Sequence, residues 1–330
     1  MARETDAPDT TRELLEPWVG RTLSKLTEAP DAVNLPMIRH WVDALDDQNP
    51  VYLDEPFAAT TRFGGLVAPP AMLQAWTMAR PLIAGIAERG GAPREVNTKS
   101  PISILDGAGF TGTLATNSEL EFVRYLRIGD RLRSSTVVES ISDRKTTGLG
   151  AGYFLTWVTT FLDASNDVVG RQRFRILKFD PRRVDADGPR RGRSEKHTPA
   201  DTGEELPAFD LVVTPTVIVA GALASRDFMP AHHDAEFARR QGAPDIFMNI
   251  LTSNGYVSRY ITDWAGPEAV LRSIAIRLGA PAIPGLVLRF TGHVSSSSKD
   301  GDARVVEVAV RAHNDLGDHL TGTVKLALPD

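Results

Sequence analysis

The run DFMPAH at Asp227–His232 has a counterpart, DQNPVY, at Asp47–Tyr52. In both runs a proline stands three residues after the aspartate, and a phenylalanine follows the sixth position at the same distance, at Phe237 and Phe57. The second copy keeps an Asp/His pair, whereas the first has tyrosine at the histidine position. The repetition predicts two halves of the same architecture, of which only the second has a complete acid–base pair.

One apolar helical pattern follows each aspartate motif. In the first half, apolar residues at three- and four-residue steps predict a helix from Pro70 to Ile83, and Pro81 is expected to kink or end it. In the second half, Asp245 is a suitable N-cap for a helix whose apolar residues run from Ile246 to Tyr260. Each half is therefore expected to contain one long helix.

Strand patterns follow both helices. Apolar runs bounded by turn residues predict strands at 119–126, 131–140, 154–162 and 169–179, and again at 273–278, 287–294, 305–312 and 320–328. One helix followed by an antiparallel meander, present twice, predicts an α+β fold in which the helix is packed in the concave face of the sheet.

A polar, arginine-rich stretch separates the two halves. Charged residues, glycine and proline predominate between Asp180 and Pro207. This composition favours a solvated connector, although its arginines are also able to meet a nucleotide phosphate. We therefore expect a first domain at residues 1–180, a linker at 181–206 and a second domain at 207–330.

The overall composition excludes several classes of protein. With 330 residues, 42% hydrophobic and 24% charged, the chain is typical of a globular protein with two cores. The absence of cysteine excludes disulfides, thiolate metal sites and cysteine nucleophiles. A net charge of −5 disfavours nucleic-acid binding. Neither a membrane span nor a signal peptide is apparent, so the cytoplasm is the expected location.

Asp227 and His232 are the candidate catalytic pair. A regular helix would place side chains five residues apart about 140° from each other, but Pro230 favours a tight non-helical segment that can aim both at one water. Histidine is suited to acid–base chemistry near neutral pH. Two alternatives stay open: a turn-capping Asp227 with a surface His232, and a metal site with His233 and Asp234, for which further ligands at a familiar spacing are missing.

The run Ser225–His232, with Asp234 and Phe237 after it, resembles the hydratase motif of the MaoC-like (R)-specific enoyl-CoA hydratases. The runs Asp245–Leu251 and Thr262–Gly266 resemble the catalytic subunit of the actinobacterial heteromeric hydratase of steroid side-chain degradation. Three runs of the first half are similar to its partner subunit: Asp47–Pro50, Phe57–Thr61 and Ala68–Leu73. The resemblance implies a double hot-dog fold and a fusion of the two subunits.

The resemblance also implies roles for individual residues. Asp227 and His232 would activate water for addition to the α,β double bond of a bulky, steroid-derived enoyl-CoA thioester. The backbone N–H that binds the thioester oxygen, usually supplied by a glycine in this family, falls on Asn249. Because Tyr52 is a poor base at neutral pH, Asp47 lacks a competent partner, and the first half is expected to accommodate substrate instead of catalysing.

Expected ligands and partners follow from the same resemblance. No metal and no redox cofactor is expected, and coenzyme A arrives as part of the substrate. The candidates for its phosphates are Arg259, Arg272, Arg277 and Arg289, although arginines on strands are often merely solvated. A homodimer is expected, with any aldolase and zinc-ribbon/OB-type module as separate proteins. The alternatives are a hydratase or dehydratase of fatty 3-hydroxyacyl-CoA, a thioesterase, and a non-catalytic acyl-CoA-binding module.

Overall fold

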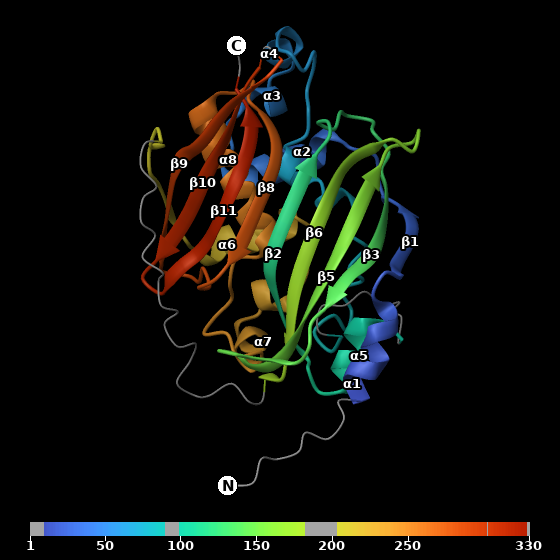
Figure 1. Ribbon diagram of the computed structural model, residues 1–330. Helices are drawn as coiled ribbons and strands as arrows, with labels where there is room; N and C mark the ends of the chain where they lie inside the picture. Colours follow the sequence, from blue (N-terminus) through green and yellow to red (C-terminus); the bar gives the residue numbers. More distant parts are fainter. Residues whose placement is uncertain (1–9, 90–98, 182–202, 302, 329–330) are drawn as a thin grey trace.

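In the computed structural model, residues 10–89, 99–181, 203–301 and 303–328 are described. Both halves contribute to one antiparallel sheet of 11 strands, and helices of both halves lie against one of its faces (Figure 1). Across the sheet the strands are β1 (Thr22–Glu28), β3 (Arg133–Ile141), β5 (Gly150–Leu162), β6 (Val168–Phe179), β2 (Gly112–Phe122), β8 (Val270–Leu278), β11 (Gly317–Ala327), β10 (Ala303–Asn314), β9 (Val287–Asp300) and β7 (Phe209–Val212), with β4 (Lys145–Thr147) paired to β5.

The two halves meet where β2 pairs with β8. Leu120 lies opposite Ile274 and Glu119 lies opposite Ala275 in an antiparallel register. Because successive side chains of a strand point to opposite faces, Leu120 and Ile274 are buried on the helix side, whereas Glu119 is exposed on the outer side. The hydrogen-bonded joint makes one continuous sheet out of the strands of both halves.

The second half contains the long helix that its sequence predicts. Its helices are α6 (Pro215–Ala224), the 3-10 helix η5 (Pro230–His232), α7 (Ala235–Arg240) and α8 (Ile250–Ala265). Helix α8 is buried along most of its length, from Ile250 to Ser258 without a break. The predicted start at Asp245 is wrong, because the side chain of Asn249 caps α8 by accepting the Thr252 N–H at 2.8 Å.

The first half lacks its predicted long helix. Its helices are α1 (Thr10–Leu15), η1 (Glu16–Trp18), α2 (Leu35–Leu45), α3 (Pro50–Leu53), α4 (Glu55–Thr60), the 3-10 helices η2 (Pro70–Met72) and η3 (Ala75–Thr77), and α5 (Pro101–Gly107). Only two 3-10 turns occupy the region expected to be helical from Pro70 to Ile83. Pro69 caps η2 without a side-chain hydrogen bond, and Ile83 is 60% exposed, so the apolar residues do not share one buried face. The helix prediction for this half is wrong.

Two glycines let α2 and α6 approach the central helix closely. A Cβ atom at Gly255 of α8 would lie 2.5 Å from Leu45 Cδ1 and 2.9 Å from Trp41 Cζ2, both on α2. A Cβ atom at Gly221 of α6 would lie 2.4 Å from Thr252 Oγ1 on α8. Buried residues of both halves belong to one hydrophobic cluster around these contacts. The core of the molecule therefore spans the joint.

The two halves repeat each other at an offset of 180 residues through their helical segments. The same local structure occurs at matched positions: Asn34 and Thr214 are the N-caps of α2 and α6, Asp46 and Arg226 follow those helices with φ of 50° and 59°, and Asp54 and Asp234 are the N-caps of α4 and α7. Asp47 and Asp227 follow the two residues of positive φ. The repeat seen in the sequence is therefore a repeat of backbone structure.

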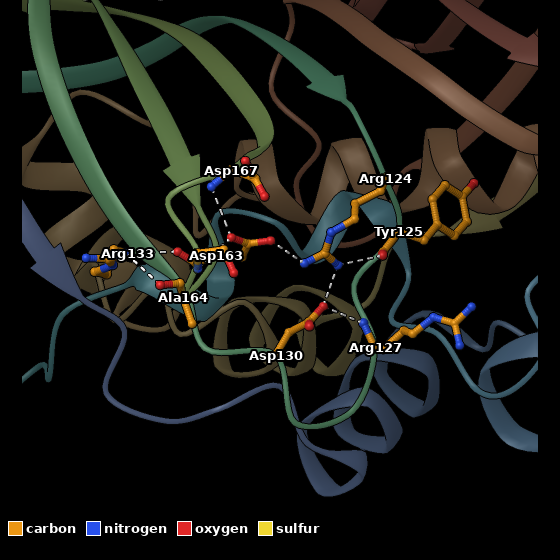
Figure 2. Close-up of polar contacts among 9 residues, drawn as sticks. Arg124, Tyr125, Arg127, Asp130, Arg133, Asp163, Ala164 and Asp167 are labelled. Atoms are coloured by element: carbon orange, nitrogen blue, oxygen red, sulfur yellow. Dashed lines mark hydrogen bonds and ion pairs between the residues drawn. The ribbon is translucent and has the colours of Figure 1, made fainter.

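An arginine network fixes the end of the first half next to the joint (Figure 2). Arg124, just after β2, binds Asp130 at 2.6 Å and Asp163 at 3.1 Å, so it connects the β2–β3 loop to the β5–β6 turn. The neighbouring Tyr125 hydroxyl accepts the main-chain N–H of Leu271 on β8 at 2.9 Å. These bonds hold the two halves in register at this end.

The predicted strands correspond to β2, β3, β5, β6, β8, β9, β10 and β11, with shifts of several residues at some ends. Strands β1, β4 and β7 were not predicted. The segment 182–202, which makes up most of the predicted linker, lies outside the described residues, and the predicted domain boundaries stay a prediction. No helix in the described ranges is long and apolar enough to cross a membrane.

Candidate active site

The segment between α6 and α7 brings Asp227 and His232 together. Arg226, with its positive φ, turns the chain at the end of α6, and His232 ends the 3-10 helix that Pro230 begins. Asp227 Oδ2 and His232 Nε2 are 3.5 Å apart. The segment is tight, as the sequence predicts, and it brings the two side chains together, but its last three residues form a 3-10 helix instead of the predicted non-helical chain.

A main-chain carbonyl orients the imidazole of His232. His232 Nδ1 lies 2.7 Å from the carbonyl oxygen of Phe247, just before α8. Because a carbonyl oxygen can only accept, Nδ1 carries a proton and Nε2 is the nitrogen that exchanges protons beside Asp227. The Phe247 ring also packs edge-on to the imidazole, with ring centroids 5.0 Å apart.

Two hydrogen bonds fix the carboxylate of Asp227. Its Oδ1 accepts the main-chain N–H of Met229 at 3.2 Å, and its Oδ2 accepts the side-chain amide of Asn249 at 3.0 Å. The Asp227 side chain keeps 19% of its surface exposed, whereas that of His232 keeps 8%. The carboxylate is thus held in place while one part of it stays accessible.

Each member of the pair shifts the pKa of the other. Burial alone would raise the pKa of Asp227, but His232 and the hydrogen bonds from Met229 and Asn249 outweigh it, so this pKa lies below its usual value. Burial alone would lower the pKa of His232, but Asp227 and the Phe247 carbonyl outweigh it, so this pKa lies above its usual value. The pair therefore favours a carboxylate beside an imidazolium.

The amino-terminal end of α8 lies directly beside the pair. The side chain of Asn249 occupies the N-cap and bonds Asp227, so the first turn of α8 and the carboxylate are in contact. Among the described residues, the main-chain N–H of Asn249 has no hydrogen-bond partner, and the next two N–H groups belong to a first turn that leaves them without intrahelical partners. These N–H groups and the helix dipole favour negative charge at this position.

Matching hydrogen bonds identify the equivalent position in the first half. The main-chain N–H groups of Phe247 and Met248 bind the carbonyl oxygens of Ala231 and Ala282 at 3.4 and 3.0 Å. The bond from Phe247 to Ala231 recurs 180 residues earlier as Val67 to Val51 at 3.2 Å, and Ala68, which matches Met248, also donates its N–H to a main-chain carbonyl, that of Leu126, at 2.9 Å. The backbone is therefore in register up to the residue before Asn249.

The first half has lost its N–H donors as well as its histidine. The residues that match Asn249 and Ile250 are Pro69 and Pro70. Proline has no backbone N–H, so this half cannot present the donors that begin α8. Together with Tyr52 in place of His232, both components of the candidate site are missing.

The aspartate of the first half is in a different electrostatic state. Asp47 is 2% exposed and accepts the main-chain N–H of Asn49 at 3.1 Å. Burial raises the pKa of Asp47 to about 6, with Asp263 and Asp46 adding to the effect and Arg259 opposing it. The ionised form is therefore disfavoured at Asp47 and favoured at Asp227, although the two aspartates occupy matched positions.

The first half also forms part of the surroundings of the pair. Ala231, Phe237 and Ala238 form a small buried cluster beside His232, and Ala87 of the first half packs against it. The chain that follows η3 therefore reaches the side of the second half on which the pair lies.

The four arginines predicted to bind the phosphates of coenzyme A are engaged elsewhere or lie on the outer side of the sheet. Arg259 donates to the Leu45 carbonyl at 2.6 Å and lies over the Phe209 ring at 4.9 Å. Arg272 binds Asp300 at 2.5 Å, Arg289 binds Asp210 at 2.9 Å, and Arg277 is an exposed residue of β8. The structure does not bring them to the Asp227–His232 pair, and their binding of coenzyme A stays a prediction.

A groove of about 930 Å³ lies over the joint on the outer side of the sheet. Its lining includes Glu119, Glu121, Arg173, Arg272 and Lys325, and neither member of the pair belongs to it. Residues of β2, β5, β6, β8, β9 and β11 line it. This groove is therefore separate from the Asp227–His232 pair.

Sequence reasoning missed two parts of the site. The Phe247 carbonyl is a main-chain group, so the identity of the residue does not reveal its role. It points at His232 only because tertiary contacts place the segment before α8 next to this ring. Pro70 is the predicted start of a helix, and both prolines belong to the run Ala68–Leu73 that resembles the partner subunit, but neither prediction connects them to missing N–H donors. Alignment of the two halves at their constant offset would have set these prolines against Asn249 and Ile250.

Solved structures with the same fold support the architecture. A MaoC-like dehydratase superposes with a TM-score of 0.70 at 20% identity and covers 95% of this chain and 99% of its own. A Mycobacterium tuberculosis protein described as having a double hotdog fold superposes with a TM-score of 0.61 at 16% identity and covers 94% of this chain and 98% of its own. These similarities confirm the α+β double hot-dog fold.

Sequence relatives are closer over parts of the chain. A FAS1-like dehydratase domain region matches residues 18–172. The 3-oxo-4,17-pregnadiene-20-carboxyl-CoA hydratase beta subunit of Mycobacterium tuberculosis is 48% identical over 128 residues, which are 39% of this chain and 96% of that subunit. The chain belongs to the MaoC-like dehydratase family. A probable enoyl-CoA hydratase alpha subunit of Thermomonospora curvata is 44% identical over 171 residues, and this MaoC-like chain spans about half, 52%, of its length.

Proposed function

We propose that this MaoC-like protein is an enoyl-CoA hydratase that adds water to the α,β double bond of a bulky enoyl-CoA thioester. The observation that carries the proposal is the convergence of Asp227, His232 and the amino-terminal end of α8. Asp227 Oδ2 lies 3.5 Å from His232 Nε2, and Asn249 connects the carboxylate to the helix end at 3.0 Å. Relatives of the chain are named as hydratase subunits, which agrees with this chemistry.

In the proposed reaction the pair begins as a carboxylate and an imidazolium. Water held between them attacks Cβ while Asp227 accepts one of its protons, and His232 Nε2 donates a proton to Cα. Afterwards Asp227 is protonated and His232 is neutral, and return of one proton from Asp227 to His232 restores the starting state. The net change is addition of one water to the alkene.

The N–H groups at the start of α8 supply the second component. As water adds to Cβ, negative charge develops on the thioester oxygen. Donors that are already oriented at this position lower the energy of that charge without reorganising during the reaction. We assign the main-chain N–H of Asn249 to this oxygen. A backbone donor requires no particular side chain, so asparagine serves where the family usually has glycine.

A steroid-derived acyl group is the proposed substrate class. One support is the name of the Mycobacterium tuberculosis relative, a pregnadiene-carboxyl-CoA hydratase subunit. The other is the first half, where two short 3-10 helices stand in place of the long helix of the second half, so the two halves differ in shape at this position. The alternative is a straight-chain fatty enoyl-CoA, and the ratio of kcat/KM for the two substrates decides between them.

The proposed assembly follows from the relatives as well. Because one chain is similar both to a protein named alpha subunit and to one named beta subunit, we propose that it unites their roles in one polypeptide. A homodimer of this chain, with an aldolase and a zinc-ribbon/OB-type protein as separate partners, remains part of the proposal.

The test is a hydration assay on the full chain with steroid and straight-chain enoyl-CoA thioesters, followed by mass spectrometry. Gain of one water supports the proposal, whereas release of free coenzyme A would show a thioesterase. Asp227→Asn and His232→Ala should each abolish hydration while leaving the fold intact. Binding of the thioesters without turnover by the unaltered chain would instead show a non-catalytic acyl-CoA-binding module.

A further inference from the structure

We propose that the side-chain amide of Asn249 is a positioning group that locks the Asp227 carboxylate to the amino-terminal end of α8. The inference rests on the proposed function and adds a role for the side chain of Asn249, distinct from the role of its backbone N–H. One residue then fixes the distance between the group that accepts the proton of water and the donors that receive the developing negative charge.

The orientation of the amide follows from its partners. Asn249 Oδ1 accepts the main-chain N–H of Thr252 at 2.8 Å, so the amide oxygen faces α8. Nδ2 therefore points the other way and donates to Ser225 Oγ at 2.9 Å and to Asp227 Oδ2 at 3.0 Å. The hydroxyl of Ser225 is itself directed to the Ala222 carbonyl at 3.1 Å, which leaves its oxygen free to accept from Asn249. A flipped amide would place a donor against a donor at Thr252.

The contacts leave the side chain no alternative position. Asn249 is 3% exposed, and its amide joins three parts of the chain: Ser225, the C-cap of α6, the turn that carries Asp227, and the first turn of α8. Ser225 is fully buried at 0% exposure, so the second donor bond is also inside the protein. Bonds to a carboxylate are among the stronger hydrogen bonds in proteins because one partner is charged.

The amino-terminal half provides an internal comparison. Asp47 sits at the end of an equivalent helix, after an equivalent residue of positive φ, and accepts an equivalent bond from the residue two positions on. Pro69 stands where the second half has Asn249, and no amide reaches Asp47 from that position. Burial then dominates and the pKa of Asp47 rises to about 6, whereas the pKa of Asp227 is lowered. His232 accounts for part of this difference and the Asn249 amide for another part.

Two substitutions separate positioning from capping. Asn249→Ser keeps a good N-cap for Thr252 but removes the amide that reaches Asp227. Asn249→Asp keeps both the shape and the capping oxygen, and it replaces the donor by an acceptor that repels the carboxylate. The matched control is Asn34→Ser, since Asn34 caps α2 in the same way by accepting the Met37 N–H at 3.0 Å and has no contact with Asp227.

We expect Asn249→Ser to lower kcat about 10- to 100-fold, in line with loss of a bond to a charged group, with KM changed less than about threefold. The acidic limb of the kcat/KM profile should move to higher pH, because the carboxylate loses a donor. Asn249→Asp should lower kcat further. Asn34→Ser should keep the wild-type kcat and pH profile. A wild-type kcat and profile in folded Asn249→Ser would overturn the proposal.

A second measurement does not depend on turnover. Titration of the Asp227 carboxyl carbon by NMR in the wild type and in Asn249→Ser should show a higher pKa in the variant, while the Asn34→Ser control stays at the wild-type value. An unchanged pKa would overturn the proposal. If the wild-type chain hydrates no enoyl-CoA, the proposed function fails, yet this titration still decides whether Asn249 positions Asp227.

Discussion

Replacing Asp47 by asparagine should stabilise the protein at neutral pH and leave hydration unchanged. Asp47 is the counterpart of Asp227, the proposed catalytic aspartate, in a half that has neither a histidine nor N–H donors at the matching positions. Its carboxyl group is 2% exposed, and burial raises its pKa from 3.8 to about 6. Asparagine has nearly the same shape, and its Oδ1 can still accept the Asn49 N–H.

The magnitude follows from linkage between protonation and folding. A folded-state pKa of about 6 against 3.8 means that the ionised form is disfavoured in the folded state by up to about 3 kcal/mol at 1.36 kcal/mol per unit. Above pH 6 the wild type is destabilised by this full amount. Below 3.8 both states are protonated and the cost disappears. The advantage of Asp47→Asn should therefore grow from near zero at pH 4 to about 3 kcal/mol at pH 7.5, or a rise of several degrees in Tm.

Chemical denaturation at the two pH values measures this difference, and a hydration assay runs in parallel. The matched control is Asp227→Asn, the same substitution 180 residues later. Because the pKa of Asp227 is lowered, this variant should lose stability at neutral pH, and it should also lose activity. A variant Asp47→Asn that is less stable than the wild type at pH 7.5 would contradict the raised pKa of Asp47. A variant as inactive as Asp227→Asn would show that Asp47 takes part in hydration.

Three further predictions concern the pair, a buried histidine and the helix contact. The kcat/KM profile should fall as the pH rises through the raised pKa of His232, because the imidazolium is the acid, whereas a rise there would contradict the mechanism. Burial lowers the pKa of His319 to about 4, so stability should decrease as the pH falls from 6.5 towards 4, and denaturation curves of His319→Gln should show a smaller decrease. Gly255→Ala should cost about 1–3 kcal/mol in thermal or urea unfolding, because its Cβ meets Leu45 and Trp41, and an unchanged midpoint would argue against the close α2–α8 contact.

The sequence predicted the sheet better than the helices. Alternation at residues such as those of β10 and β11 is produced by one buried and one exposed face, so it survives without tertiary information. The apolar residues Met72, Leu73 and Trp76 are also buried, at 0–3% exposure, but they lie in or next to two short 3-10 helices, of which η2 packs against α8. Their spacing predicts burial correctly. It does not predict the type of helix, because that depends on the surface against which these residues pack.

For the candidate site, the sequence predicted which residues meet but not how they are connected. Asp227 and His232 are close in the chain, and the turn at Pro230 follows from local chemistry. The sequence predicts a role only for the backbone N–H of Asn249. In the structure its side chain also binds Ser225 and Asp227, which lie more than 20 residues earlier in the chain. Such bonds depend on how α6 and α8 pack, and no spacing within one segment encodes that.

The prolines at positions 69 and 70 make the specialisation of the two halves hard to reverse. Histidine at position 52 would not by itself create a second site. Pro69 and Pro70 would still lack the backbone N–H groups that a second thioester oxygen would need. Recovery of a second reaction centre therefore requires at least three coordinated changes, and each one alone offers no catalytic gain. On the proposed mechanism only the second half can hold the reaction centre, and catalysis does not constrain the sequence of the first half at these positions.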